Sequence, residues 1–497
     1  MNFAWYTESM RKLGIGVNAF KNGVAELSQI GVNKSIGFFG DHGFGRAREN
    51  SMTRPIAIDL FAGAGGLSLG FEQAGFDIAA AVEIDPIHAA VHAYNFPQTA
   101  VLCRDISTVS GQDVRDAAGI GSRKVDVVMG GPPCQGFSLI GQRALDDPRN
   151  MLVREFVRLV CELNARYFVF ENVKGLTLGR QRLFLEEVVR SFEERGYNVR
   201  TPWRVLNAAE YGVPQDRERL ILLGARKGLK LPDYPKARTW PAGTLSLEGL
   251  KEGPSCEDAL GDLPDADSYE SLWNSDEVKL SKRAWGRPSK YAASLRCASK
   301  GAWHFGHRRA WSPDVLTSSM RTSHTEISRR RFTETEAGKV EPISRFFKLP
   351  AHGVANTLRA GTDGARGAFT SPRPIHYRFP RCITVREMAR LHGFPDWFRL
   401  HETKWHGARQ IGNAVAPPLA FELGSALLAA SGVVPKRSRA IMTLGNPNLL
   451  RMNMSEASEY WGVVKPITRR DRKSGAKKRR QHEIEAALSR RVLVAAE

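Results

Sequence analysis

The 497-residue sequence predicts an α/β fold with a mostly parallel sheet, helices on both faces of it, and a smaller irregular domain late in the chain. Three observations predict this fold. Apolar runs alternate with helical patterns from Pro55 to about Arg226, a glycine-rich turn follows the first run, and an acidic residue closes the second. Alternation of this kind is typical of βα units that build a parallel sheet.

The expected strands are short apolar runs, each bounded by polar or turn-forming residues. A helix is expected after the first strand and ends at about Ala74. The sheet should have at least five strands, formed by residues 56–61, 79–83, 125–129, 167–170 and 219–224.

The turn after the first strand has the sequence Gly63-Ala64-Gly65-Gly66. Such a turn exposes backbone amides, and a carboxylate at the end of the next strand can hold a ribose beside them. Glu83 closes the second run at close to the usual distance from the turn. Because the full GxGxxG pattern is missing, the turn argues against a dinucleotide ligand.

Asp105 lies near the expected third strand and has two interpretations. Its carboxylate is well placed to accept a hydrogen bond from an adenine amino group. It can equally serve as a cap or turn residue.

Cys134 lies on a Pro/Gly turn directly after the run 125–129. A rigid turn at the end of a strand can present a thiol to a cleft. A single cysteine in an intracellular chain is nevertheless more often a small buried hydrophobic residue than a nucleophile. The other motifs of the sequence must therefore decide whether Cys134 is a nucleophile or a buried hydrophobic residue.

The spacing of the cysteines and the length of the apolar runs argue against a disulfide-linked, metal-binding, secreted or membrane protein. No CxxC or Cys/His pair has zinc spacing, so neither a disulfide framework nor a metal site is expected, and a reducing cytoplasm fits. No apolar run approaches the roughly 18 to 20 residues that span a bilayer, and the N-terminus lacks a signal peptide's apolar region. We expect a cytoplasmic protein without a membrane partner.

The net charge of +20 is concentrated in two blocks. Residues 281–350 contain 15 Lys and Arg against 5 Asp and Glu, and residues 435–497 contain 15 against 6. Basic charge gathered in this way indicates a polyanionic partner, with nucleic acid as the leading candidate, although a solvated surface is the alternative.

The pattern also predicts the domain organisation. Residues 1–53 form an N-terminal extension. We expect residues 1–51 to be dispensable or to arise from an upstream start, because Met52-Thr53-Arg54-Pro55 would make a natural start immediately before the first strand. The βα alternation stops after residue 230 and returns at residue 377. The expected parts are therefore residues 54–230, an irregular domain over residues 231–376, a returning segment over residues 377–434, and a basic tail over residues 435–497 that can be disordered.

Six motifs occur in the order found in the DNA cytosine-5 methyltransferase family. The sequence resembles that family, in its bacterial restriction-modification form, over about residues 54–230 and 377–430. The resemblance implies the Rossmann-like fold of S-adenosylmethionine-dependent methyltransferases, with residues 54–230 as the catalytic and cofactor-binding domain. The motifs are Asp59-Leu60-Phe61-Ala62-Gly63-Ala64-Gly65-Gly66, Pro132-Pro133-Cys134-Gln135, Glu171-Asn172-Val173, Gln215-Asp216-Arg217-Glu218-Arg219, Arg386-Glu387 with its helix, and Gly412-Asn413.

The resemblance implies four catalytic residues. Cys134 would attack carbon 6 of cytosine, which makes carbon 5 able to accept a methyl group. Glu171 would be the acid at ring nitrogen 3. Arg219 would hold the exocyclic oxygen of the base or support the thiolate, and Arg217 would brace the cleft or a phosphate. The two arginines are two residues apart, so an extended segment points both to one face, and a structural salt bridge is their alternative.

The resemblance also implies the ligands. The target cytosine would be flipped out of double-stranded DNA, with residues 138–150 closing over it. Residues 231–376 would be the target-recognition domain, where Thr357-Leu358 and Arg329-Arg330-Arg331 are candidates for DNA contacts. The residues implied for S-adenosyl-L-methionine are Phe61, Gly63, Gly66, Glu83, Asp105, Pro132 and Asn413.

Two alternatives remain beside the DNA enzyme. The tRNA-methylating branch of the family carries a late Cys-Phe-Thr motif that this sequence lacks. A catalytically silent DNA-binding protein is disfavoured by the presence of Cys134, Glu171 and Arg219 together. We expect a monomer whose cognate restriction endonuclease, where one exists, acts independently. The sequence does not predict which DNA site is methylated or which base removes the carbon 5 proton.

Overall fold

The computed structural model describes residues 54–133, 150–179, 181–246, 249–362 and 370–466. The chain divides into two compact units, residues 1–52 and 53–497, and all described residues belong to the second. Cys134, residues 138–149 of the expected loop, and the Lys/Arg clusters after residue 466 lie outside the described residues.

An eight-stranded sheet forms the centre of this unit, with the strand order β3-β2-β1-β4-β5-β8-β6 and with β7 paired to β8. Strands β1 to β5 are parallel to one another, whereas β8 is antiparallel to β5, β6 and β7. The expected mostly parallel sheet is confirmed. The strands are β1 (Ile56–Leu60), β2 (Asp77–Glu83), β3 (Ala100–Cys103), β4 (Val127–Gly130), β5 (Tyr167–Val173), β6 (Tyr197–Val199), β7 (Arg204–Asn207) and β8 (Glu218–Arg226).

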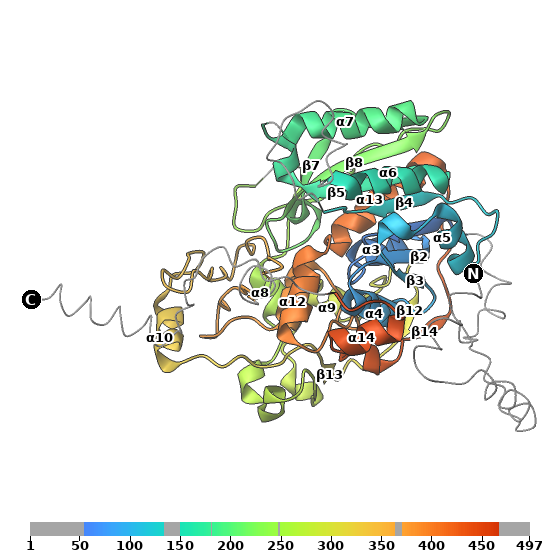
Figure 1. Cartoon of the computed structure of the whole chain (residues 1–497). Helices are drawn as coiled ribbons and strands as arrows, with labels where there is room; N and C mark the ends of the chain where they lie inside the picture. The colour runs from blue at the N-terminus through green and yellow to red at the C-terminus, as the bar shows by residue number, and fades with distance from the viewer. Residues whose placement is uncertain (1–53, 134–149, 180, 247–248, 363–369, 467–497) are drawn as a thin grey trace, which may run out of the picture. The chain divides into compact units, whose positions relative to one another are not determined.

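Side chains of the central strands alternate between two apolar cores, one on each face of the sheet. On β5, Phe168 and Phe170 enter one core while Tyr167 and Val169 enter the other. Because both faces are buried, the strands are almost continuously apolar, which is why the sequence predicts them. Figure 1 shows the helices around these strands. Helices α5 (Gly111–Ala118), α6 (Met151–Glu162) and α7 (Gln181–Glu194) cover the first core, and α3 (Gly66–Ala74) and α13 (Pro417–Ser431) cover the second.

A third apolar core joins the sheet domain to the irregular region. It contains residues of α4 (Pro86–Asn95), of the segment 256–316 and of helices α11 (Val385–His392) and α12 (Lys404–Asn413). The irregular region contains only short elements among the described residues. These are β9 (Thr239–Trp240), β10 (Lys251–Glu252), α8 (Cys256–Leu260), β11 (Val278–Lys279), α9 (Lys290–Leu295), β12 (Arg308–Ala310), β13 (Val315–Leu316) and α10 (Glu326–Glu334).

The structure corrects the expectation that the segment after residue 434 is a plain tail. Strand β14 (Ile441–Thr443) pairs in parallel with β12, and helix α14 (Met454–Trp461) follows it. The indole of Trp461 donates a hydrogen bond to the carbonyl of Pro86, 3.1 Å away, at the start of α4. Residues 435–466 are therefore packed onto the body of the protein.

Residues Lys404–Ser431 are the one described segment with the length and apolar character of a membrane span. The segment is two helices, α12 and α13, separated by the turn at Ala414–Ala416. Its apolar side chains belong to the cores described above, where α13 packs on α3. Packing inside the fold accounts for this apolar stretch.

Candidate active site

The carboxyl ends of β1, β2, β4 and β5 meet at one edge of the sheet. The chain runs from β1 outward to β2 and β3 and then crosses back to β4, which lies on the other side of β1. Such a reversal of strand order leaves a crevice between neighbouring strands, and ligands bind there in open α/β sheets. The predicted site residues follow these strand ends.

The glycine-rich turn after β1 provides an open notch. Gly63 has a φ of +55°, and a Cβ atom placed on it would meet nothing within 4 Å. Phe61, at the end of β1, also has a positive φ, of 61°, which a non-glycine residue adopts only under constraint from its surroundings. Constrained backbone next to open space is typical of a ligand-binding turn.

Glu83 closes this notch from the end of β2. Its carboxylate accepts hydrogen bonds from the backbone amides of Gly63, at 2.7 Å, and Asp85, at 2.9 Å. Burial raises the pKa of Glu83, and these amides oppose that effect. The turn and the acid that the sequence pairs are therefore in direct contact, and each carboxylate oxygen retains acceptor capacity.

The returning C-terminal segment packs directly on the same turn. A Cβ atom on Gly66 would lie 2.4 Å from the carbonyl oxygen of Val415, so only glycine fits there. Asn413 is the exposed last residue of α12, two positions before Val415. Asn413 and Gly66, which the family resemblance implies for one cofactor site, are thus brought to neighbouring positions.

Asp105 occupies a cap position. Its Oδ1 accepts hydrogen bonds from the amide and hydroxyl of Ser107, at 3.0 and 2.9 Å, at the start of a short 3-10 turn. This is the structural interpretation of Asp105 given above. The exposed side chain lies one residue beyond Arg104 and two beyond the end of β3.

A buried polar chain lies behind the glycine-rich turn. Asp59 on β1 accepts hydrogen bonds from the amide and hydroxyl of Ser68, and the Ser68 hydroxyl lies 3.0 Å from Nε2 of His92. Burial raises the pKa of Asp59 to about 7 and lowers the pKa of His92 to about 3. The sequence pattern did not predict this network, although Asp59 belongs to the first motif.

Asp59 should make the stability of the fold depend on pH. Its folded pKa of about 7 exceeds the ordinary value of 3.8, so the folded state binds the proton more tightly than the unfolded state. This stabilisation is complete below pH 4 and is lost as the pH rises to about 7, at up to about 1.4 kcal/mol per pH unit. The lowered pKa of His92 acts in the opposite direction up to about pH 6.5, so the contribution of Asp59 must be measured as a difference between two proteins. Relative to Asp59→Asn, the wild type should lose free energy of unfolding in urea as the pH rises from 4 to 7. The same pH dependence in both proteins would assign the effect to another group.

Glu171 and Arg219 form an ion pair at the end of β5. Nε of Arg219 lies 2.8 Å from Oε1 of Glu171, and the two side chains are 13% and 11% exposed. The antiparallel pairing of β5 with β8 places Val173 opposite Arg219, so Glu171 and Arg219 are diagonal neighbours on one face. Burial raises the pKa of Glu171, against the opposing charges of Arg219 and Arg217.

The same carboxylate lies against the turn that leads to Cys134. A Cβ atom on Gly131 would lie 2.5 Å from Oε2 of Glu171. The side-chain amide of Asn172 donates to the carbonyl of Pro132, at 3.0 Å, and Pro132 is buried. The backbone that enters the cysteine turn is therefore held by the residue next to Glu171, a role for Asn172 that its sequence context alone did not reveal.

Replacing Gly131 with Ala should lower the methylation rate without unfolding the protein. The added methyl group would displace the Glu171 carboxylate from Arg219, and a displacement of about 1 Å can cost on the order of 100-fold in rate. Gly175→Ala is the matched control, because its Cβ atom would make only an ordinary contact, 3.7 Å from Gln181. Equal activity of the two variants, with equal melting temperatures, would contradict this prediction.

Arg217 differs from Arg219 in its surroundings. It is 1% exposed, and its guanidinium donates hydrogen bonds to the backbone carbonyls of Leu358, Gly412 and Ala414 at 2.8 to 3.1 Å. Burial lowers its pKa, and the nearby Arg219 adds to this effect. These contacts make Arg217 a positioning residue that joins three distant segments, and they support its bracing role over contact with a phosphate.

Gln215 completes this junction. Its side chain accepts from the amide of Leu358 and donates to the carbonyl of Leu391. Arg217 and Gln215 together tie the sheet domain to residues 358, 391 and 412–414. The motif that contains them therefore serves both the site and the attachment of the irregular region.

The candidate DNA-contacting residues differ in exposure. Leu358 is 1% exposed and belongs to the junction, whereas Thr357 is exposed, with its hydroxyl donating to the carbonyl of Asp216. Arg329 pairs with Asp267 at 2.8 Å and Arg331 with Glu341 at 3.3 Å. Of that arginine run, Arg330 is exposed, 3.9 Å from Glu334.

Comparisons with known proteins agree with this geometry. The family model for C-5 cytosine-specific DNA methylase matches residues 56–429. Type II methyltransferase M.XorII from Xanthomonas oryzae pv. oryzae is 55% identical over 433 residues, which cover 87% of this chain and 98% of the relative. Type II methyltransferase M1.HphI from Haemophilus parahaemolyticus is 34% identical over 374 residues, 75% of this chain and 86% of the relative.

A solved structure shows the same fold. It is a candidate DNA modification methyltransferase encoded within a prophage of E. coli, with 31% identity and a TM-score of 0.61, over 76% of this chain and 99% of the other. The chain belongs to the C-5 cytosine-specific DNA methylase family and is a DNA (cytosine-5) methyltransferase.

Proposed function

We propose that this enzyme methylates a flipped-out cytosine through a covalent adduct with Cys134, using S-adenosyl-L-methionine. The observation that carries the proposal is the buried Glu171–Arg219 pair, held against Gly131 three residues before Cys134. An acid, a cation and a cysteine turn in one crevice match what an attack on a pyrimidine ring requires.

Each residue has a distinct part in the proposed reaction. The Cys134 thiolate forms a bond to carbon 6, and Glu171 gives its proton to ring nitrogen 3 as electrons move toward that atom. Arg219, paired with Glu171, stabilises the negative charge that develops at the exocyclic oxygen. After carbon 5 has accepted the methyl group, a base such as water takes its proton and the carbon 6–sulfur bond breaks to release the thiolate. Ring nitrogen 3 then returns its proton to Glu171, which restores the acid.

The cofactor site would be the notch after β1. The open space over Gly63, the constrained Phe61 and the Glu83 carboxylate suit a nucleoside, with Pro132, Asp105 and Asn413 nearby. S-adenosyl-L-methionine supplies an electrophilic methyl group when bound. Gly66 keeps the returning segment close to this notch.

The relatives named as Type II methyltransferases support a role in a restriction-modification system. Such an enzyme would act in the cytoplasm as a monomer and protect a specific DNA site from an independent endonuclease. Residues 231–376 would select that site. Bisulfite sequencing of host DNA that expresses the chain should reveal one methylated sequence, and an unmethylated genome would count against the role.

The covalent step is tested by replacing Cys134. Cys134→Ser should abolish transfer of labelled methyl groups to DNA, because a neutral hydroxyl is a far weaker nucleophile than a thiolate. Cys161→Ser is the control, since Cys161 lies on α6, outside the crevice, and should retain activity. Methyl transfer by the Cys134 variant would refute the adduct.

A further inference from the structure

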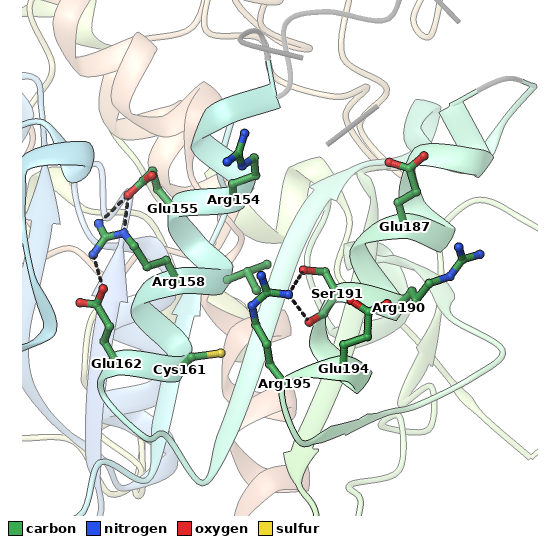
Figure 2. Close-up of a pocket in the computed structure, with 11 residues that line it drawn as sticks. Arg154, Glu155, Arg158, Cys161, Glu162, Glu187, Arg190, Ser191, Glu194 and Arg195 are labelled. Atoms are coloured by element: carbon green, nitrogen blue, oxygen red, sulfur yellow. Dashed lines mark hydrogen bonds and ion pairs between the residues drawn. The ribbon is translucent and has the colours of Figure 1, made fainter. Parts of the chain in front are cut away.

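Two hollows on the described surface differ sharply in charge. One, of about 890 Å³, lies between α6 and α7, and Figure 2 shows its lining. There, four arginines face four glutamates: Arg154, Arg158, Arg190 and Arg195 against Glu155, Glu162, Glu187 and Glu194. Opposite charges in equal number give this groove no preference for a polyanion.

The second hollow, of about 780 Å³, has lining charges of one sign only. Its residues are Arg308, Lys436, Arg437, Ser438 and Arg439, and we call it the basic hollow. The four cations are exposed, and no ion pair joins them to an acidic side chain among the described residues. Clustered like charges repel one another, so the fold must hold them together.

The basic hollow is lined by two segments that lie more than a hundred residues apart in the sequence, one at Arg308 and one at residues 436–439, and both are fixed by contacts with the fold. Strand β12 pairs with β14, and Arg309, next to Arg308, forms a buried ion pair with Glu72 at 2.8 Å. On the other side, the guanidinium of Arg54 donates to the carbonyls of Phe305 and Lys436. The hollow is a built surface, because its backbone is anchored from both segments.

The basic hollow lies at the opposite edge of the sheet from the active site. Arg54 precedes β1, and its partner Asp77 is the first residue of β2. Glu83 ends β2, seven residues long, so the two edges are about 20 Å apart. DNA held at the carboxyl edge therefore leaves the hollow open to a different stretch of DNA.

We propose that the basic hollow binds the phosphodiester backbone of duplex DNA outside the methylated site. Lysine and arginine side chains without acidic partners release counterions when they meet phosphates, which gives affinity without sequence preference. Duplex DNA is the occupant that the charge favours, since the chain belongs to a DNA methylase family. The surface would retain the enzyme on DNA between target sites.

The test compares two double variants that each remove two positive charges. Lys436→Gln with Arg439→Gln alters the basic hollow, and Arg154→Gln with Arg190→Gln alters the balanced groove. Affinity for a long duplex without target sites is measured over a series of salt concentrations. Each lost phosphate contact should reduce the slope of log affinity against log salt by about 0.9, so the first variant should lose about 1 to 2. The second should keep the wild-type slope.

Methylation of a short duplex that holds only the target site separates this surface from the active site. It should proceed at the wild-type rate in the Lys436/Arg439 variant and fail in Cys134→Ser, whose salt slope should stay unchanged. Equal slopes in the wild type and the Lys436/Arg439 variant would overturn the proposal. Equal losses in both double variants would also overturn it, as would slow methylation of the short duplex.

Discussion

Glu171→Gln should lower the rate of methyl transfer by about 10² to 10⁴-fold, the range typical of a lost general acid. Glutamine keeps the shape of the side chain and can donate a hydrogen bond to ring nitrogen 3, but it cannot transfer a proton. Burial raises the pKa of Glu171, so the acid form extends to higher pH than for an ordinary glutamate. Wild-type activity should therefore decline as the pH rises through the raised pKa of Glu171. This decline should be absent in Glu171→Gln.

Glu218→Gln is the matched control for this experiment. Glu218 is the first residue of β8, and its partly exposed carboxylate pairs with Lys174 at 2.8 Å. Exposed pairs of this kind contribute at most about 1 kcal/mol, so the rate and its pH profile should be unchanged. A Glu171 variant with wild-type activity would show that the ring is not protonated by this residue.

Arg217→Met should destabilise the protein by about 3 to 5 kcal/mol, because the buried carbonyl groups of Leu358 and Gly412 would lose their donor. The carbonyl of Ala414 would lose one of two partners, since Nε2 of His392 lies 3.0 Å from it. Methionine fills a similar volume, so the loss measures hydrogen bonding more than packing. The free energy of unfolding in urea gives the size of the effect. Binding of DNA should weaken as well, since the junction with residues 358 and 412–414 loosens.

Arg204→Met controls for the loss of an arginine from the same part of the sheet. Arg204 begins β7 and is exposed, with its guanidinium 5.9 Å from the ring centroid of Tyr234. Its replacement should change the free energy of unfolding by no more than about 0.5 kcal/mol. Similar losses in both variants would show that the carbonyl contacts of Arg217 contribute little.

The central strands could be predicted from the sequence because they are buried on both faces. A run such as Tyr167 to Phe170 has no room for polar side chains, whichever face each residue meets. Strands β3, β6 and β7 were not among the predicted runs, because they are three or four residues long and include partly or fully exposed positions such as Val101 and Arg204. Their pairing depends on neighbours rather than on their own apolar content.

The sequence predicts the motifs of the candidate site but not the separate roles of the residues within each motif. Arg217 and Arg219 are the same residue type two positions apart. They differ because segments 141 and 195 residues away supply carbonyl groups to Arg217, whereas β5 supplies a carboxylate to Arg219. No local pattern carries that information, and the role of Asn172 at Pro132 was missed for the same reason.

The contact of Val415 with Gly66 has a consequence for the time at which the enzyme becomes active. The turn that follows β1 leaves the ribosome early, but the backbone that covers it is made some 350 residues later in the chain. Helix α13 must then dock on α3, where Gly70 and Gly424 allow close approach. A nascent chain therefore carries an unfinished notch, and the enzyme cannot modify the genome until the segment that contains Val415 has been made and has docked.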